Sequence, residues 1–270
     1  MNRYQRIAAT SRPGASFGVA LRVVALLAAV AAWGAGAAAP RAAAEEDEVR
    51  MALSLAKLLQ AGRAVISSNQ DLINDPSIGD KGLSGEVVLD KTIQNYEQDT
   101  GLDPTKVDPD SRHGRLLRAE MAVIKEVVDE NQSFINQEGV GFKAFIPAVF
   151  ARLVTERLVD KVGEELEIKV TAPPALVRNR KSRPDDWERG IIESKFLSPE
   201  WKAGEIFYQE QPSRGRDAFR VMVPEYYAQS CLSCHGEPKG EMDITGYPKE
   251  GASEGDLGGV ISITLYRQGE

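Results

Sequence analysis

The hydrophobic pattern of the chain changes its period near residue 165. Before that point apolar residues recur at helical spacing, which is typical of amphipathic helices. After it, short apolar runs bounded by Gly and Pro indicate strands, with one helical segment among them. Helices followed by an antiparallel sheet predict an α+β fold. We expect helices at 45–70, 85–98, 111–137, after Pro147 and at 184–196, and strands at 165–171, 205–210, 218–223 and 260–266.

The composition narrows the class of protein. Hydrophobic residues make up 42% of the chain and charged residues 27%, as in ordinary globular proteins. These proportions exclude a disordered, collagen-like or multi-span membrane protein. The formal net charge is −7, whereas broad nucleic-acid binding needs a basic surface. We therefore expect no nucleic-acid partner.

Residues 1–44 have the composition of a secretory signal peptide. They contain five Arg and no acidic residue, and the segment 23–40 is uncharged and rich in Ala. A basic start, a short apolar core and small residues before a cut are typical of such signals. An uncleaved anchor is the alternative, but the run is short of the roughly 20 apolar residues of a membrane span. We expect cleavage after Ala44, export to the periplasm, and a soluble mature chain with a helical part at 45–164 and a sheet part at 165–270.

Both cysteines of the chain lie in one pentapeptide, Cys231-Leu232-Ser233-Cys234-His235. The pattern Cys-x-x-Cys-His is the attachment signature of c-type haem. Each thiol adds to one vinyl group of the porphyrin, and the adjacent histidine is held where its imidazole can bind the iron. One motif predicts one covalent haem c, with Cys231 and Cys234 as thioether residues and His235 as the proximal iron ligand.

Three other interpretations of the cysteines stay open. A thioredoxin-like Cys-x-x-Cys would begin a helix in a βαβ unit, and no such pattern surrounds the motif. A zinc site usually takes four ligands, and the chain has only two His and two Cys, so Asp or Glu would have to complete it. A disulfide between Cys231 and Cys234 suits an exported protein but leaves His235 unexplained.

The sequence leaves the sixth iron ligand open. His113 is the one other histidine, in a polar context that favours a solvated side chain. Methionine sulfur is the other common ligand and raises the haem potential. Met121 lies on the apolar face of a predicted helix, Met222 in a predicted strand, and Met242 in a Gly-rich loop. Core packing explains Met121 well, since methionine commonly fills gaps in cores. An open sixth position is also compatible with the chain.

A basic run, Arg178-Asn179-Arg180-Lys181-Ser182-Arg183, follows the first predicted strand. Haem carries two propionates, and arginine pairs with carboxylates in a bidentate manner. Arg178, Arg180 and Arg183 are therefore candidate propionate partners. The alternative is a solvated loop, which is what charge runs usually form.

The sequence also resembles a family of exported domains that carry one c-type haem on a PAS-like fold. The resemblance is carried by KVTAP at 169–173, VRN at 177–179, RP at 183–184, PEYY at 224–227, CLSCHG at 231–236 and GDLGGVIS at 255–262. It implies N-terminal helices followed by a PAS-like antiparallel sheet that carries the haem. It maps Cys231 and Cys234 to the thioether residues and His235 to the proximal ligand. In a relative, a cysteine of the helical part is the second axial ligand; this chain has no third cysteine, so that ligation is not carried over.

These observations favour a periplasmic monohaem cytochrome with a PAS-like domain, acting in redox or gas sensing or in single-electron transfer. The acidic mature chain suits a basic redox partner through charge complementarity. One alternative is a haem enzyme, peroxidase-like or nitric-oxide-processing, for which His113 is the one spare histidine. The other alternative is a module that binds a small molecule and uses the haem as a structural element.

Overall fold

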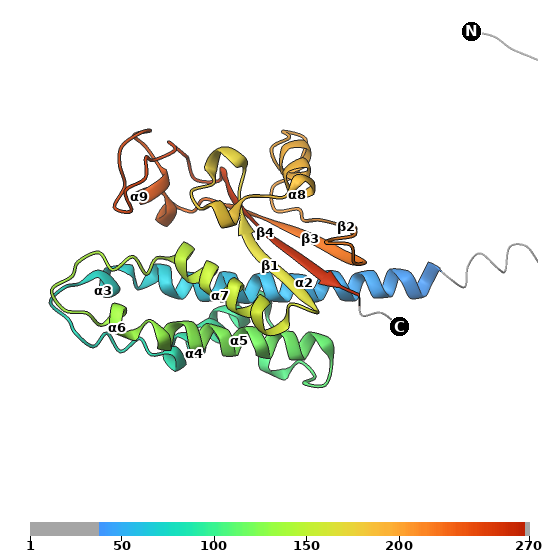
Figure 1. The fold of residues 1–270 in the computed structure, drawn as a ribbon, viewed down its shortest axis with the longest axis horizontal. Helices are drawn as coiled ribbons and strands as arrows, with labels where there is room; N and C mark the ends of the chain where they lie inside the picture. The colour runs from blue at the N-terminus through green and yellow to red at the C-terminus, as the bar shows by residue number, and fades with distance from the viewer. Residues whose placement is uncertain (1–37, 268–270) are drawn as a thin grey trace, which may run out of the picture. The chain divides into compact units, whose positions relative to one another are not determined.

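The computed structural model describes residues 38–267 (Figure 1). Most of the expected signal peptide, residues 1–37, lies outside the described residues, so export stays a prediction. The residues from Asp47 onward form one compact unit. No helix among residues 38–267 combines the length and the apolar content that a membrane span requires.

Helices make up the first part of this unit, as the hydrophobic spacing predicts. The side chains of Ser84 and Ser111 each accept a hydrogen bond from a first-turn backbone N–H, which fixes where two of the helices begin. The expected helix 111–137 is broken at Asn131 into two helices. In chain order the helices are α2 (Ala38–Ser68), α3 (Gln70–Asn74), α4 (Gly85–Thr100), α5 (Arg112–Glu130), α6 (Gln132–Ile135) and α7 (Pro147–Val162), with a short 3-10 turn η1 (Pro104–Lys106) before α5.

The second part is a four-stranded antiparallel sheet in the order β1-β4-β3-β2. Its strands are β1 (Leu166–Thr171), β2 (Phe207–Glu210), β3 (Ala218–Tyr226) and β4 (Leu257–Tyr266). The last strand of the chain therefore lies inside the sheet, paired with β1 on one side and β3 on the other. Between β1 and β2 the chain forms η2 (Pro174–Leu176), η3 (Arg180–Ser182), α8 (Asp186–Ile191) and the π-helical turn η4 (Ile192–Phe196). The predicted α+β class is confirmed.

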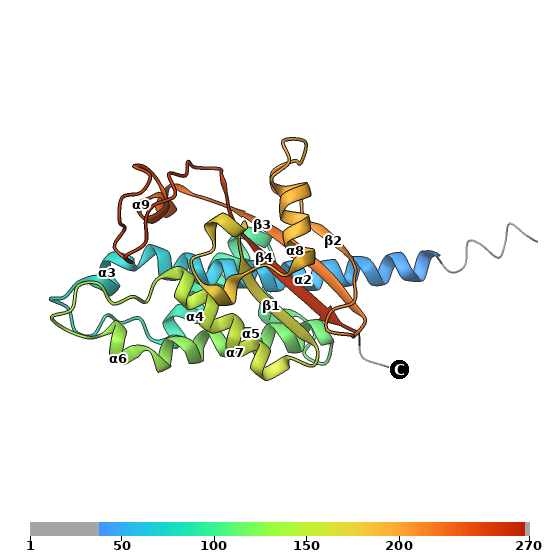
Figure 2. The same ribbon diagram turned by 45° about the horizontal axis from the view of Figure 1, so that its top comes forward.

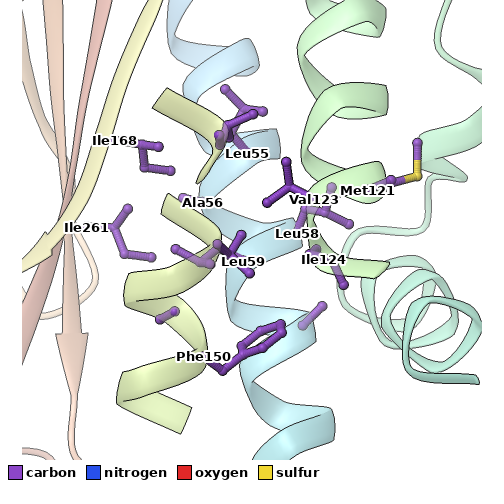
Figure 3. Packing of buried hydrophobic residues seen from close by; sticks show 14 of the residues in the cluster. Leu55, Ala56, Leu58, Leu59, Met121, Val123, Ile124, Phe150, Ile168 and Ile261 are labelled. Carbon is purple, nitrogen blue, oxygen red and sulfur yellow. The ribbon is translucent and has the colours of Figure 1, made fainter. Parts of the chain in front are cut away.

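Both faces of the sheet are covered (Figures 1 and 2). The main core fills the space between one face and the helices, with Leu59, Phe150 and Ile261 among its buried residues (Figure 3). A smaller core lies on the other face, under α8 and η4, and contains Met222 and Val260. Neighbours along a strand point to opposite faces, which is why Val260 and Ile261 belong to different cores. A sheet covered on both sides explains the nearly continuous burial of β3 and β4.

A buried arginine holds α8 on the sheet. Arg220 of β3 is 5% exposed. Its Nη2 donates to Asp185 Oδ2 at 2.7 Å and to Glu188 Oε1 at 3.3 Å, and its guanidinium lies 4.1 Å from the ring centre of Trp187. Lys169 of β1 adds a second cation, 2.8 Å from Glu188 Oε2. Charge pairing and aromatic packing together fix this helix over the smaller core.

Glu120 of α5 has no exposed surface, and neither of its carboxyl oxygens has a hydrogen-bond partner within the described part of the chain. Burial disfavours the charged form of a carboxyl group. It raises the pKa of Glu120 well above its ordinary value of 4.5. The folded protein therefore keeps Glu120 as a neutral acid at pH values where the unfolded chain has already released this proton.

We expect the contribution of Glu120 to the free energy of unfolding to fall as the pH rises from 4.5 towards its folded pKa, because in that window this group binds fewer protons in the unfolded state. Glu120→Met removes the group, so the variant should lose this pH dependence. At pH 8 it should gain on the order of 1–2 kcal/mol, the cost of burying an unsatisfied polar group, with a smaller gain at pH 4. Urea unfolding of both proteins at the two pH values measures the effect. Equal pH slopes would contradict it.

Candidate cofactor attachment site

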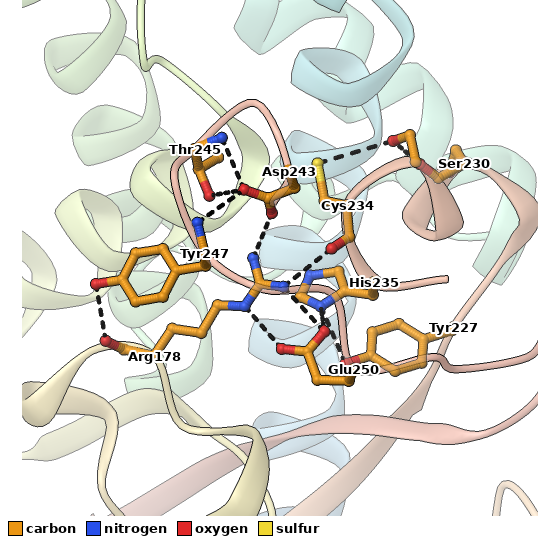
Figure 4. A network of polar contacts seen from close by, with 10 residues as sticks. Arg178, Tyr227, Ser230, Cys234, His235, Asp243, Thr245, Tyr247 and Glu250 are labelled. Atoms are coloured by element: carbon orange, nitrogen blue, oxygen red, sulfur yellow. Dashed lines mark hydrogen bonds and ion pairs between the residues drawn. The ribbon is translucent and has the colours of Figure 1, made fainter. Parts of the chain in front are cut away.

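The Cys-x-x-Cys-His motif lies in the connection between β3 and β4, at one end of the two central strands (Figure 4). It forms the short turn η5 (Gln229–Cys231) and the single helical turn α9 (Leu232–His235). Cys231 and Cys234 carry free thiols and are partly exposed. Residues three apart on a helical turn are neighbours on its surface. The turn therefore offers two sulfurs on one side and places His235 directly after them.

The connection, residues 228–256, is called the motif loop below. Its base is closed by two backbone hydrogen bonds, Tyr227 N to Asp256 O at 2.9 Å and Gly255 N to Tyr227 O at 2.8 Å. A third backbone hydrogen bond, Ala252 N to His235 O at 2.8 Å, joins the motif to the far side of the loop. These bonds hold the motif against the ends of the central strands.

The ring of His235 has two polar neighbours, and both contact the same nitrogen. Nδ1 lies 2.8 Å from Glu250 Oε2 and 3.3 Å from the hydroxyl of Tyr227 (Figure 4). The Tyr227 ring also stacks on the imidazole, with ring centres 4.8 Å apart. A carboxylate can only accept hydrogen bonds, so Nδ1 must carry the proton. In the neutral form of the ring the free lone pair is then on Nε2, the nitrogen that could bind iron.

The ionisation of the two neighbours agrees with this assignment. Burial opposes the charge on Glu250, but hydrogen bonds from Arg178 and His235 hold its pKa below the usual value. Burial and the negative charge of Glu250 raise the pKa of Tyr227 to about 12. At neutral pH the histidine therefore faces one carboxylate and one neutral hydroxyl. Metal-binding histidines commonly give their second N–H to such a carboxylate.

Arg178 ties the motif to both sides of its loop (Figure 4). Its Nε and Nη2 donate to the two carboxylate oxygens of Glu250 at 2.8 and 2.9 Å. Its Nη1 donates to Asp243 Oδ2 at 2.7 Å, and its Nη2 also donates to the backbone oxygen of Cys234 at 2.9 Å. All three guanidinium nitrogens of Arg178, which we expected to face a propionate, thus donate hydrogen bonds to groups of the chain itself. Arg178 therefore lies beside the motif, and its hydrogen bonds hold the helical turn α9 to Glu250 and Asp243.

The side chain of Asp243 organises the far part of the motif loop. Its Oδ1 accepts hydrogen bonds from the backbone N–H and the hydroxyl of Thr245 and from the backbone N–H of Tyr247. Burial of Asp243 opposes its charge, but these donors together with Arg178 lower its pKa well below the ordinary value. The hydroxyl of Tyr247 returns a hydrogen bond to the backbone oxygen of Arg178 at 3.2 Å.

Helix α2 supplies a cation that the sequence analysis missed. Arg63 Nη1 contacts both carboxylate oxygens of Glu225, at 2.7 and 2.6 Å, where β3 approaches the motif loop. The charge of Glu225 raises the pKa of Arg63, and Cys231 contributes to the same shift. Arg63 Nε is buried without a hydrogen-bond partner in the described residues. The partner carboxylate is 162 residues away in the sequence, so no local pattern could have identified this arginine.

The other predicted site residues are not brought to His235. Arg180 and Arg183 are exposed, and neither forms a hydrogen bond or ion pair with the motif among the described residues. Met121 is buried in the main core and Met222 in the smaller core. Met242 adjoins Asp243 in the motif loop and is 60% exposed.

His113 lies at the opposite end of the sheet. It is the second residue of α5 and follows Arg112, whose Nη2 donates to the backbone oxygen of Tyr266 at the end of β4. The motif loop leads into the beginning of β4, and a strand of 10 residues spans about 30 Å. His113 is therefore far from His235 within one chain. Burial lowers its pKa, and its Nε2 has no hydrogen-bond partner in the described part.

Among residues 38–267, no set of three His, Cys, Asp or Glu side chains is placed to hold a metal ion.

Gly258 of β4 makes room for the ring that stacks on His235. A Cβ atom at this position would lie 2.6 Å from Cε1 of Tyr227, too close for any side chain. Gly258→Ala should therefore displace the Tyr227 ring and destabilise the fold by about 1–3 kcal/mol, as overpacking commonly does. Thermal unfolding measures the loss.

Gly190→Ala is the matched control. It lies in α8, and a Cβ there meets no atom within 4 Å. Alanine is favoured over glycine inside a helix, so this variant should unfold at the wild-type temperature or above it. A Gly258→Ala protein as stable as the wild type would show that Tyr227 is not confined by β4.

Comparison with protein-family models finds one match, to the Tll0287-like family, over residues 41–265. No curated protein and no solved structure matches the chain. The matched residues include the described helices after the first turn of α2, the motif loop and the four strands except the last residue of β4. The chain is therefore a member of the Tll0287-like family of cytochrome-like proteins.

Proposed function

We propose that the protein is an exported c-type cytochrome with one covalent haem. Cys231 and Cys234 attach the haem, and His235 binds its iron through Nε2. The observation that carries the proposal is the hydrogen bond of His235: a carboxylate takes Nδ1–H, and this histidine directly follows two cysteines that carry free thiols. Membership of a cytochrome-like family supports it independently.

The residues around the motif fit such a group. Glu250 and Tyr227 fix the plane and the tautomer of the His235 ring, and Arg178 holds the turn through the backbone of Cys234. The Nε of Arg63 is buried without a hydrogen-bond partner among the described residues, and Arg63 contacts Glu225 of β3. This nitrogen is suited to a propionate, because a buried donor without a partner is costly. Haem bound here would supply one-electron chemistry.

The biological role that we propose is electron transfer or redox sensing in the periplasm. The basic, Ala-rich start of the chain supports export, and the acidic composition supports a basic protein partner. An antiparallel sheet with its last strand in the interior supports the PAS-like assignment. The reduced spectrum with carbon monoxide separates the roles: an unchanged spectrum favours electron transfer or redox sensing, and a shifted one favours gas sensing.

Covalent attachment is tested by producing the full chain with a c-type maturation system. The wild type should keep haem through denaturing electrophoresis and should give the spectrum of a haem with two thioether bonds. Replacing both Cys231 and Cys234 by Ala should abolish haem retention, because no other cysteine exists in the chain.

Ser233→Ala is the control inside the motif. Ser233 is exposed, and its hydroxyl contacts the backbone oxygen of Ser230, so haem should be retained in this variant. A wild-type protein without covalent haem, or a double variant that keeps it, would refute the proposed function.

A further inference from the structure

We propose that Glu250 acts through His235 to stabilise the oxidised iron, and so lowers the reduction potential of the haem. The inference rests on the proposed function and goes beyond it, because it assigns control of the potential to a residue outside the motif. Glu250 is a positioning residue here: it contacts the ligand and not the iron.

The contact has the geometry of a charge-assisted hydrogen bond. Glu250 Oε2 is 2.8 Å from Nδ1 of His235, within the range expected when the acceptor is ionised. The carboxylate side chain is 17% exposed, so water screens it only partly. A partly buried anion that accepts the hydrogen bond from Nδ1–H pulls on that proton and raises the basicity of the imidazole ring. A more basic imidazole donates more electron density to the iron and so favours its higher oxidation state.

The surrounding charges leave a net negative charge beside the histidine. Arg178 pairs with two carboxylates, those of Glu250 and Asp243. One cation against two anions gives the group a net charge of −1. Arg178 therefore holds Glu250 in position without cancelling its field. An uncompensated negative charge near the ligand stabilises a more positive iron by Coulomb attraction, most strongly where water is partly excluded.

Glu250→Gln is the direct test in the haem-loaded full chain. Glutamine keeps the size and an oxygen acceptor but removes the charge. At a fixed solution potential we expect the ratio of reduced to oxidised haem to rise about tenfold, which corresponds to a potential about 59 mV higher for one electron. Spectroelectrochemical titration measures the ratio. Electron paramagnetic resonance of the oxidised protein, which reports the donor strength of the axial ligands, should change in the same variant.

Two control variants separate the effect of the Glu250–His235 hydrogen bond on the potential from the effects of a lost charge elsewhere in the loop and of the Tyr227 hydroxyl. Glu241→Gln removes the same charge from the same loop, where Glu241 pairs with Lys249 and not with His235; its potential should stay close to the wild-type value. Tyr227→Phe keeps the ring stack but removes the hydroxyl contact, and should move the potential less than Glu250→Gln.

The outcomes distinguish this inference from the proposed function. A Glu250→Gln protein that carries covalent haem and shifts no more than Glu241→Gln overturns the inference and leaves the cytochrome assignment intact. A wild type without covalent haem overturns the assignment itself. Should Glu250→Gln fail to accumulate, Glu250→Asp keeps the charge and lengthens the contact; it should raise the potential by a smaller amount, and an unchanged potential there refutes the inference.

Discussion

The burial of β4 in the middle of the sheet is the interaction on which the rest of the structure depends. Its side chains alternate between two cores, so Ile261 and Ile263 face the helices while Val260 faces the smaller core under α8. The same strand pairs with β1 and β3 along its length. The beginning of the strand also shapes the site, because Gly258 admits the Tyr227 ring and Asp256, just before the strand, closes the base of the motif loop. Strand β4 thus connects both cores to the loop that carries the Cys-x-x-Cys-His motif.

The hydrophobic periodicity of the sequence predicts most helices and strands, because each of these elements buries one side of a short segment of the chain. The predicted helix over 184–196 is divided between α8 and a π-helical turn, and the expected strand at 260–266 begins at Leu257. The order of the strands could not be predicted in this way. It is set by which faces pack together, and β4 lies between β1 and β3 with the residues from Val260 to Tyr266 buried on both faces.

The residues of the candidate site could likewise be predicted only in part. Spacing alone predicts Cys231, Cys234 and His235 as site residues, since the chemistry of c-type haem attachment fixes their distance along the chain. The residues that support the motif are far apart in the sequence, so no local pattern links them. Arg178 lies 72 residues before Glu250, and Arg63 lies 162 residues before Glu225. The basic run around Arg178 suggested three equivalent arginines. The structure distinguishes them, because Arg178 alone of the three is drawn inward by two carboxylates, while Arg180 and Arg183 remain exposed.

The two hydrophobic cores are complete without the motif loop. No residue of 228–256 belongs to either core among the described residues, and the loop is held by polar contacts, led by those of Arg178 and Asp243. The packing of both cores therefore does not depend on the motif loop, and the thiols of Cys231 and Cys234 are partly exposed at the edge of the fold. A covalent group of the kind that we propose for these thiols would be added at this edge and not inside a core.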